Sequence, residues 1–504
     1  MSVVLGVDIG TYEAKGVLVD EDGRIVASHR RPHRVTVPQP GHAEHDPEAV
    51  WWGGFVGVTK ALLSASAMAR SEVAAISISG IGPCVLPLDS SGAPLRNAIL
   101  YGVDARAADQ IEQLNDAFGE QEIFERSGTS LTSQSAGPKI AWIEQNEPDI
   151  FARTALFVTC QTFVTGRLTG RWVLDHATAA YYHPLYDRRR LGWNMEGYPG
   201  ALTPDQVPEV GWSCDVAGVV TRAAAEATGL SAGTPVLVGA PDAAAEALSA
   251  GVSAHREMML MYGSSHFVIE VLDDARTSKV LWPAPYLFPD THLLAAGTAT
   301  AGSFTRWFAD LLSPEADGGD ALYTDLADLA ATSPPGARGL LALPYLSGER
   351  TPLFDPGARG ALLGLSLRHN RGDVARAIAE SIAHSAAAAL RSFDAEGVSP
   401  EMIRAVGGGT RNHVWTQAVS DITGYPQEVV TGPGAAFGDA MLAAMAAGML
   451  DGPSGSRRWV TPAMLITPRR EFAALYDRQR ELFEQLYRST RPIVTALDEL
   501  RNSS

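Results

Sequence analysis

Lysine is nearly absent from this chain. Among its 504 residues it occurs only at positions 15, 60, 139 and 279, and the formal net charge is −17. A surface that binds nucleic acid needs clustered lysine and arginine, so that class of function is excluded. An anionic ligand would have to be held by backbone amides, a few local cations and a metal ion.

Cysteine is scarce as well. Cys84, Cys160 and Cys214 lie far apart and are odd in number, which predicts reduced thiols of a cytoplasmic protein rather than a disulfide framework. The longest apolar segment, Ala440 to Leu450, is too short to span a membrane and predicts a buried helix. The N-terminus enters a strand at once, without a basic and then apolar leader. We therefore expect a cytoplasmic protein with no membrane partner.

The familiar nucleotide-binding loops are missing. The chain has no G-x-x-x-x-G-K-[ST] and no G-x-G-x-x-G pattern, which disfavours P-loop and dinucleotide-binding proteins. The run G-H-A-E-H-D (Gly41 to Asp46) holds metal-ligand residue types, but all of them are crowded into one turn. We interpret it as a surface loop that ends at Asp46, the N-cap of a helix from Pro47 to Val58.

What the chain does have is a regular alternation of strand-like and helix-like segments, which predicts an α/β fold. Its length exceeds one ordinary core, so two large domains are expected. Hydrophobic residues make up 46% and charged residues 19%, as in globular proteins. Asp373 to Leu390 predicts a long, alanine-rich helix that packs closely on a sheet.

The segment G-V-D-I-G-T-Y-E-A-K (Gly6 to Lys15) is the most informative. Apolar runs on both sides predict a β-hairpin whose tip can hold a phosphate. Gly10 lets the backbone approach an anion, and backbone N–H groups, Thr11 and Lys15 can donate to it. Asp8 repels phosphate, but it can hold a Mg²⁺ ion, usually through water. An ordinary polar hairpin tip is the alternative.

A second hairpin, M-L-M-Y-G-S-S-H-F-V-I-E (Met259 to Glu270), repeats this logic near the middle of the chain. Its tip is Gly263-Ser264-Ser265. Either hairpin alone is weak evidence, whereas two of them predict two halves of similar design. Each half would offer one phosphate loop, and the site would lie in the cleft between the halves.

Two further motifs carry chemistry. Asp242 stands where a strand meets an alanine-rich helix, so it is either an N-cap or a general base, and its place just before the second hairpin favours the base. Gly407-Gly408-Gly409 would let a flat ring lie against bare backbone, with a flexible loop and helix cap as the alternative. The later glycine-rich run 432–438 predicts a helix used for packing.

Taken together, the chain resembles the FGGY family of carbohydrate kinases, within the wider group that includes actin, hexokinase and chaperone ATPases. The resemblance covers nearly the whole chain in order. Its most specific parts, in combination, are Y-L-S-G-E-R-T-P (Tyr345 to Pro352) and the triple-glycine segment G-G-G-T-R-N. Within the family the chain is most similar to the xylulokinases.

This resemblance implies two ribonuclease-H-like domains flanking a catalytic cleft, at residues 1–247 and 248–490, with a tail at 491–504 that forms a short helix and a frayed end. It implies ATP and Mg²⁺ as cofactors and phosphorylation of a small sugar or polyol, foremost a ketopentose such as D-xylulose. The resemblance also implies a homodimer.

The resemblance implies roles for single residues. Asp242 would accept the proton of the sugar hydroxyl, and Asp8 would position the Mg²⁺ of MgATP. The residues expected to hold the nucleotide are small, hydroxyl-bearing or donate hydrogen bonds: Thr11, Lys15, Gly263, Ser264 and Ser265 at the phosphates, and Gly408, Gly409 and Asn412 beside adenosine.

The chain departs from its relatives where they contact the sugar. Gly82-Pro83-Cys84 replaces Met-His-Gly, and Tyr101-Gly102-Val103-Asp104 replaces Trp-Asn-Asp. Losing the histidine removes a hydrogen bond to the sugar, so the alternative substrates are ribulose, a pentitol, gluconate or glycerol. The sugar-facing wall is expected at Gly82, Pro83 and Asp104, with Gln134 as a weaker candidate.

Two other classes remain as alternatives. An ATP-driven clamp would need a peptide-binding module after the ATPase core, and the triple-glycine segment leaves little room for one. An inactive sugar-binding relative is disfavoured by the presence of Asp8, Thr11 and Asp242.

Overall fold

The computed structural model describes residues 2–66, 72–312, 321–432 and 434–502. The chain folds into two compact units. Unit 1 contains Met1–His255, Val271–Leu293 and Pro433–Val460, and unit 2 contains Arg256–Glu270, Leu294–Gly432 and Thr461–Ser504. The expected single division after residue 247 differs from this arrangement, because a late segment of the chain packs in unit 1.

Unit 1 is built on a seven-stranded mixed sheet. The main path is β13 (Val216–Val219), β14 (Pro235–Leu237), β5 (Val73–Gly80), β1 (Val3–Ile9), β2 (Glu13–Asp20) and β3 (Ile25–Pro32). In the first hairpin, β1 and β2 pair antiparallel; β5 pairs in parallel with β1, and β14 pairs in parallel with β5. β15 (Ala240–Pro241) pairs with β5 outside the main path.

The second sheet also has seven strands. The order is β18 (Trp282–Pro285), β19 (His292–Gly297), β17 (His266–Leu272), β16 (Glu257–Tyr262), β22 (Met402–Val406), β23 (Gln427–Val430) and β24 (Pro462–Ile466). In the hairpin of this sheet, β16 and β17 pair antiparallel; β22 pairs in parallel with β16, and β23 pairs in parallel with β22.

The two sheets repeat one design. In each, the first hairpin strand has its hairpin partner on one side and two parallel strands on the other, and an antiparallel edge strand ends the row. The predicted α/β fold with two similar halves is therefore confirmed.

Strand β1 explains why helices must cover both faces of the first sheet. All of its residues from Val3 to Ile9 are buried, and side chains of a strand alternate between faces. On one face Gly16 of β2 lies against Val58 and Leu62 of α1 (Gly53–Ala65). On the other face Gly6 lies against the backbone of α14 (Ala435–Ala446).

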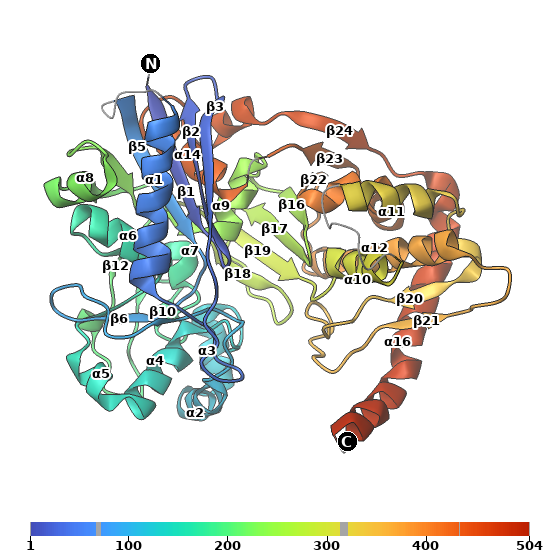
Figure 1. Ribbon diagram of the computed structural model, residues 1–504. Helices are drawn as coiled ribbons and strands as arrows, with labels where there is room; N and C mark the ends of the chain where they lie inside the picture. The colour runs from blue at the N-terminus through green and yellow to red at the C-terminus, as the bar shows by residue number, and fades with distance from the viewer. Residues whose placement is uncertain (1, 67–71, 313–320, 433, 503–504) are drawn as a thin grey trace. The chain divides into compact units, whose positions relative to one another are not determined.

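Helix α14 is the late segment that joins unit 1. The orange α14 lies against the blue strands β1 and β5 (Figure 1), although more than 350 residues separate Ser79 from its partner Asp439. Its residues from Ala435 to Ala444 are buried, which confirms a packing helix. No helix in the described ranges has the length and apolar character needed to cross a membrane.

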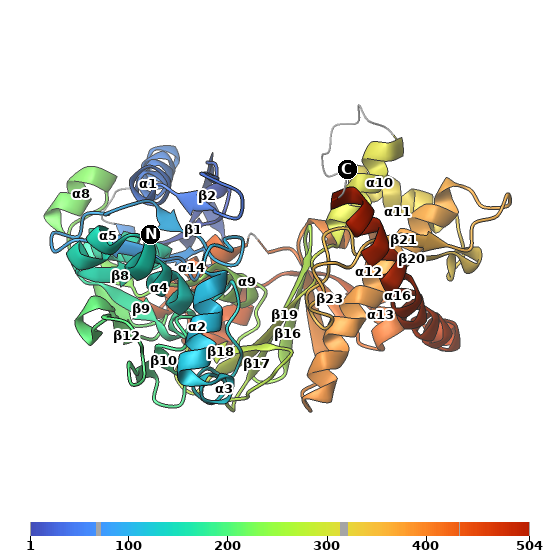
Figure 2. The same ribbon diagram turned by 90° about the horizontal axis from the view of Figure 1, so that it is seen from below.

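The helices of unit 2 pack largely on one another. α12 (Arg371–Ala395) confirms the predicted alanine-rich helix, and it packs against helices α11 and α13, which lie near it in Figure 2. The predicted tail helix is the end of α16, which runs from Ala473 to Asn502. The remaining helices of this unit are α10 (Gly302–Leu312), α11 (Ala321–Ala331) and α13 (His413–Thr423).

The run from Gly41 to Asp46 corrects one expectation. Asp46 caps the helical turn η1 (Pro47–Trp52), which leads into α1, as predicted. Glu44 and His45, however, are buried in the short strand β4 rather than exposed in a surface loop. The reason is that Glu44 pairs with the buried Arg106 guanidinium, at 2.9 Å between Oε1 and Nη1.

Unit 1 also contains shorter elements: β4 precedes β5, the elements from β6 to β12 and from α2 to α8 lie between β5 and β14, and α9 follows β15. The helices are α2 (Ala108–Phe118), α3 (Glu120–Ser127), α4 (Ala136–Asn146), α5 (Pro148–Arg153), α6 (Cys160–Thr169), α7 (His176–Ala179), α8 (Arg222–Thr228) and α9 (Asp242–Ser249). The strands are β4 (Glu44–His45), β6 (Leu86–Leu88), β7 (Ala98–Ile99), β8 (Leu156–Val158), β9 (Val173–Asp175), β10 (Tyr186–Asp187), β11 (Gly192–Trp193) and β12 (Glu209–Gly211).

Candidate active site

A group of acids gathers in unit 1 at the carboxyl ends of its parallel strands. Asp8 lies near the end of β1 and is only 5% exposed. Asp242 begins helix α9 directly after β15, which pairs in parallel with β5 as β1 does. Open α/β sheets place their ligands at this edge. The fold therefore brings together the two aspartates that the sequence singled out.

The environment of these acids is unfavourable for negative charge. Burial, together with the charges of Asp242 and Glu246, raises the pKa of Asp8 to about 8 against the opposing charge of Lys15. Burial also raises the pKa of Asp242 to about 6, against the lowering effects of the Ala243 N–H and Lys15. Mutual repulsion among buried carboxylates is what a bound cation relieves.

The tip of the first hairpin is a closed turn. The N–H of Gly10 donates to the carbonyl of Glu13 at 3.0 Å. Thr11 and Tyr101 are linked through their hydroxyls at 3.1 Å, and Lys15 Nζ lies 3.1 Å from Glu13 Oε1. The predicted hairpin is confirmed, and its lysine is held at the tip by a neighbouring carboxylate.

Two histidines that the sequence reasoning did not single out support this tip. His33 Nε2 donates to the carbonyl of Gly10 at 3.0 Å, and His45 Nε2 donates to the carbonyl of Thr11 at 3.1 Å. The Trp51 indole donates to His45 Nδ1 at 3.1 Å, which fixes the proton of His45 on Nε2. A histidine beside the N-cap Asp46 could have suggested such a buried contact.

Two acids near Asp8 were also missed. Glu246 stands one turn after Asp242 on α9, and burial raises its pKa. Asp439 is fully buried and bonds to Ser79 of β5. Spacing on the helix could have indicated Glu246, and an acid alone in the apolar segment 435–446 could have indicated Asp439.

The turn expected to face the sugar is mostly packed inward. Pro83 and Cys84 are buried, whereas Gly82 is half-buried. The N–H of Cys84 donates to Thr159 Oγ1 at 3.1 Å, and the Tyr182 hydroxyl donates to the carbonyl of Cys84 at 3.0 Å. Of the three residues, Gly82 offers the most accessible surface.

The neighbouring turn depends on a glycine. The N–H of Gly102 donates to Gln134 Oε1 at 3.2 Å, and a Cβ at Gly102 would lie 2.6 Å from Gln134 Cδ. The buried ammonium of Lys139 donates to the carbonyls of Tyr101 and Ser133, at 3.0 and 2.6 Å. Burial lowers the pKa of Lys139 to about 8. This lysine, which the sequence reasoning missed, fixes the turn from behind.

Asp104 does not match its expected place on the sugar-facing wall. Its side chain is fully buried. Arg106 donates to it from Nη2 at 2.7 Å, and the N–H of Ala43 donates at 2.6 Å. The carboxylate is drawn inward because it compensates the buried Arg106 guanidinium, which stacks on Trp142.

In unit 2 the Gly263-Ser264-Ser265 turn sits on the start of α10. The N–H groups of Ala301 and Ser303 donate to the carbonyl of Ser264 at 2.8 and 3.1 Å, and that of Gly302 donates to Gly263 at 3.0 Å. The helix terminus thereby fixes the carbonyls of the turn.

The diagnostic segment Tyr345 to Pro352 stands beside this turn. Arg350 Nη2 donates to Ser265 Oγ at 3.4 Å. Glu349 accepts bonds from the N–H of Ala299 at 2.6 Å and from Ser385 Oγ at 2.7 Å. The segment therefore connects the second hairpin tip to the core of unit 2.

The triple-glycine segment forms a bare surface beside a tight contact. A Cβ on Gly408 would meet no heavy atom of the described residues within 4 Å. A Cβ on Gly409 would lie 2.5 Å from the Trp415 ring. Asn412 is buried and caps α13, with Oδ1 accepting from the N–H of Trp415 at 3.0 Å. The triple-glycine segment lies between strand β22 and helix α13.

Across the described ranges, no group of three or more His, Cys, Asp or Glu side chains is arranged to hold a metal ion by itself.

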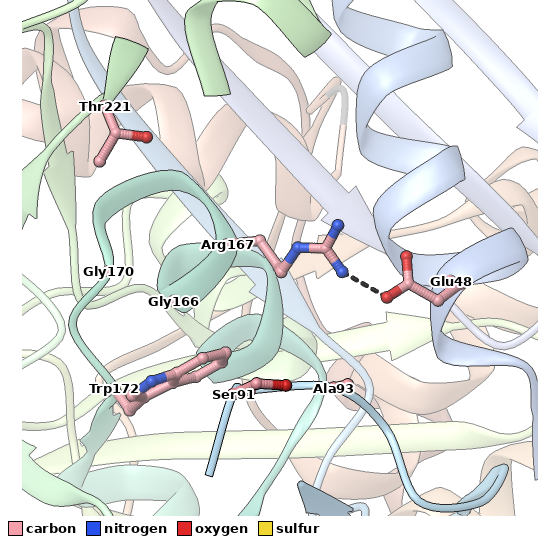
Figure 3. Close-up of a pocket in the computed structure, with 9 residues that line it drawn as sticks. Glu48, Ser91, Ala93, Gly166, Arg167, Gly170, Trp172 and Thr221 are labelled. Carbon is pink, nitrogen blue, oxygen red and sulfur yellow. Dashed lines mark hydrogen bonds and ion pairs between the residues drawn. The ribbon is translucent and has the colours of Figure 1, made fainter. Parts of the chain in front are cut away.

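A separate cavity of about 400 Å³ in unit 1 is lined by Trp172, Ser91 and several small residues. Figure 3 shows that the guanidinium of Arg167, which also lines this cavity, points toward Glu48 and forms an ion pair with it. This cavity contains none of the predicted site residues.

Comparison with known proteins decides the family. The model of the N-terminal domain of the FGGY family of carbohydrate kinases matches residues 3–249, and the model of its C-terminal domain matches residues 258–447. The chain belongs to the FGGY family of carbohydrate kinases. It is thus a carbohydrate kinase, and the reaction of the family is the phosphorylation of a sugar by ATP.

Several FGGY kinases resemble this chain over its full length. A xylulose kinase of Staphylococcus epidermidis is 29% identical and covers 99% of both chains, and one of Bacillus subtilis is 28% identical and covers 100% of both. The crystal structure of xylulose kinase from Rhodospirillum rubrum has a TM-score of 0.90 at 32% identity, over 98% of this chain and 100% of the other. These similarities confirm the predicted fold and the similarity to xylulokinases.

Proposed function

We propose that this chain transfers the γ-phosphoryl group of ATP to a hydroxyl of a ketopentose, with D-xylulose as the first candidate. The observation that carries the proposal is the buried pair Asp8 and Asp242 at one edge of the unit 1 sheet, in a chain that matches the family over both halves. The names of the xylulose kinases that it resembles support the choice of sugar.

In this proposal Asp242 is the general base. The sugar oxygen attacks the γ-phosphorus, the bond to the β-phosphate oxygen breaks, and the hydroxyl proton passes to Asp242. A pKa of about 6 leaves Asp242 ionised at neutral pH and still able to accept a proton. In a loose transition state the proton leaves late, so a stronger base is not required.

Asp8 is proposed to bind Mg²⁺. Its carboxylate is the oxygen ligand that Mg²⁺ prefers, and a cation would relieve the repulsion from Asp242 and Glu246. No three-residue metal cluster is found among the described residues, so water and the nucleotide would complete the coordination. When bound, Mg²⁺ neutralises charge on the transferred phosphoryl group.

The nucleotide is proposed to contact both hairpin tips and the glycine segment. Backbone N–H groups at these turns can donate to phosphate oxygens, and the bare surface at Gly408 suits a flat ring. The residues in this role are Thr11 and Lys15 of the first hairpin, Gly263, Ser264 and Ser265 of the second, and Gly408, Gly409 and Asn412.

The sugar is proposed to contact Gly82, Pro83 and the turn held by Gln134. Asp104 contributes indirectly, because its carboxylate is bound to Arg106 and Ala43. Because this chain lacks the histidine of its relatives at this turn, the sugar site has one hydrogen-bond donor fewer. This loss changes which arrangement of sugar hydroxyls the site binds best.

A coupled assay of ADP release tests the proposal. The panel contains D-xylulose, ribulose, pentitols, gluconate and glycerol, each at equal concentration. We expect the highest kcat/KM with a ketopentose. Preference for another member would assign a different substrate within the family. Slow hydrolysis with every sugar, stimulated by a protein partner, would favour the ATP-driven clamp. Analytical ultracentrifugation of the same preparation measures its oligomeric state and so tests the expected homodimer.

A further inference from the structure

Asp439 is the one charged residue of helix α14 and is fully buried. A buried carboxylate is costly unless polar groups surround it. Its partners come from β5: the N–H of Ser79 at 3.0 Å and Ser79 Oγ at 2.6 Å, both to Oδ2, and Ser77 Oγ at 3.4 Å to Oδ1.

Main-chain contacts set the position of this residue. A Cβ on Gly6 of β1 would lie 1.9 Å from the carbonyl of Ala436 and 2.5 Å from the N atom of Ala440. A Cβ on Gly438 would lie 1.8 Å from the carbonyl of Ala245 in α9. The backbones of β1, α14 and α9 therefore touch around Asp439, and its carboxyl has little freedom to move.

Ser79 connects Asp439 to the acid cluster. Ser79 and Asp8 are register partners of the parallel strands β5 and β1. Ser79 Oγ lies 3.5 Å from Asp8 Oδ1 as well as 2.6 Å from Asp439 Oδ2. A serine hydroxyl has one proton and two acceptor lone pairs, so it cannot donate to both carboxylates at once.

The protonation state of Asp439 decides which carboxylate receives the hydroxyl proton of Ser79. If Asp439 is neutral, its own proton occupies the short O···O contact, and the hydroxyl proton of Ser79 is left for Asp8. Burial raises the pKa of Asp439 well above its ordinary value and the charge of Asp8 adds to this effect, against the lowering effect of the hydrogen bonds from Ser79 and Ser77. The neutral form is consistent with the shared contact.

We propose that Asp439 is a positioning residue that acts through Ser79 by directing the Ser79 hydroxyl toward Asp8 Oδ1, and so orients the carboxylate that would bind magnesium. This inference rests on the proposed role of Asp8. Partners one step behind a metal ligand hold that ligand in its binding geometry.

Four variants test it: Ser79→Ala, Asp439→Ala, Asp439→Asn and, as the matched control, Ser77→Ala. Ser77 also bonds to Asp439, but it gives no route to Asp8. The measurement is calorimetric titration of ADP at a series of Mg²⁺ concentrations. We expect Ser79→Ala and Asp439→Ala to weaken the apparent Mg²⁺ affinity about 10–100-fold. Ser77→Ala should leave it within about threefold of wild type, whatever its effect on melting temperature.

Asp439→Asn distinguishes a neutral from a charged partner. Its amide nitrogen can donate to Ser79 Oγ as a protonated carboxyl does, but it cannot also accept the N–H of Ser79 as Oδ2 does. The apparent Mg²⁺ affinity of Asp439→Asn should therefore lie between those of wild type and Asp439→Ala, about threefold or more above the alanine variant. An Asn variant as impaired as Asp439→Ala would overturn the neutral form. Asp439→Ala and Ser79→Ala that behave like Ser77→Ala would overturn the positioning role. If Asp439→Ala does not fold, the comparison of Ser79→Ala with Ser77→Ala decides.

Failure of the proposed function would look different. In that case ADP binding by the wild-type chain would not depend on Mg²⁺, and Asp8→Asn would not change it. Binding that depends on Mg²⁺ and on Asp8, but not on Ser79, would reject the positioning role alone.

Discussion

Two buried aspartates of unit 1 show why residue type and place in the sequence do not by themselves define a role. Asp175 and Asp242 both precede or begin a short helix, and burial raises the pKa of each to about 6. Asp175 caps α7 through the N–H of Thr178 at 2.7 Å and accepts from Gln161 at 2.7 Å. Within the described part of the chain, the carboxylate of Asp242 accepts a hydrogen bond only from the N–H of its neighbour Ala243, at 2.8 Å. Asp242 therefore keeps capacity to accept a proton.

We expect Asp242→Asn to lower turnover by roughly 10²–10⁴-fold with little change in ATP affinity, because the amide cannot accept the hydroxyl proton. Asp175→Asn is the matched control: asparagine also caps helices, so turnover should remain near that of wild type. Steady-state assays and nucleotide titrations of both variants make the comparison. An Asp242→Asn enzyme with near-wild-type turnover would remove Asp242 as the base.

Glu270 of β17 predicts a pH effect on stability. It is fully buried, and neither carboxylate oxygen has a hydrogen-bond partner within the described part of the chain. Burial raises its pKa to about 7, with Arg256 lowering and Asp394 raising it. The folded state holds the Glu270 proton more tightly than the unfolded state, so the contribution of Glu270 to stability is complete below about pH 4.5. It is lost as pH rises through 7, by up to ~3 kcal/mol.

Glu270→Gln removes this ionisation. We expect the variant to be more stable than wild type at pH 8 by about 1–3 kcal/mol, with the gain lost at pH 5. Urea unfolding at both pH values measures the difference. Glu401→Gln is the control, since Glu401 also faces Arg256 but is largely exposed. A constant difference between Glu270→Gln and wild type at the two pH values would contradict the assignment.

At the scale of elements, the contact between β1 and α14 depends on the absence of a side chain. The strand and helix approach so closely at Gly6 that a Cβ would overlap backbone atoms of Ala436 and Ala440. Backbone on both sides leaves no flexible group to move aside. The same strand carries Asp8, and the same helix carries Asp439, so packing and the candidate site share these elements.

Gly6→Ala should therefore destabilise the protein by ~3 kcal/mol or more. Gly192→Ala is the control: its nearest heavy atom to an added Cβ is the carbonyl oxygen of Arg190 at 3.8 Å. The control should change stability by less than about 0.5 kcal/mol. Chemical denaturation of both variants measures this, and equal stabilities would show that α14 can move away from β1 at low cost.

At the scale of the whole molecule, the sequence predicted what is encoded locally. Both hairpin tips, the strand before Asp242 and the glycine loop at Gly408 are marked by residues within a few positions of one another. The sequence did not predict that Asp104 faces Arg106, that His45 is buried, or that Asp439 contacts Ser79 across 360 positions. Those features depend on which distant segments pack together, and local patterns carry no record of that.

The return of α14 to unit 1 leads to a prediction about truncation. Phe437, Met441 and Leu442 are buried in unit 1, and side chains of this size contribute about 1.5–3 kcal/mol each when fully buried. Without α14, one face of β1 and β5 would be exposed to water. The loss is comparable to the ~5–15 kcal/mol that stabilises a typical domain.

Two truncated chains form a matched pair, one ending at residue 432 and one at residue 460. Both lack β24 and α16 of unit 2, and they differ only in the segment that belongs to unit 1. We expect hydrogen exchange to show protected amides in β1 and β5 of the longer chain and rapid exchange in the shorter one. Equal protection in both chains would mean that the first 255 residues bury these strands without α14, and the observed division into units would not describe how the chain is stabilised.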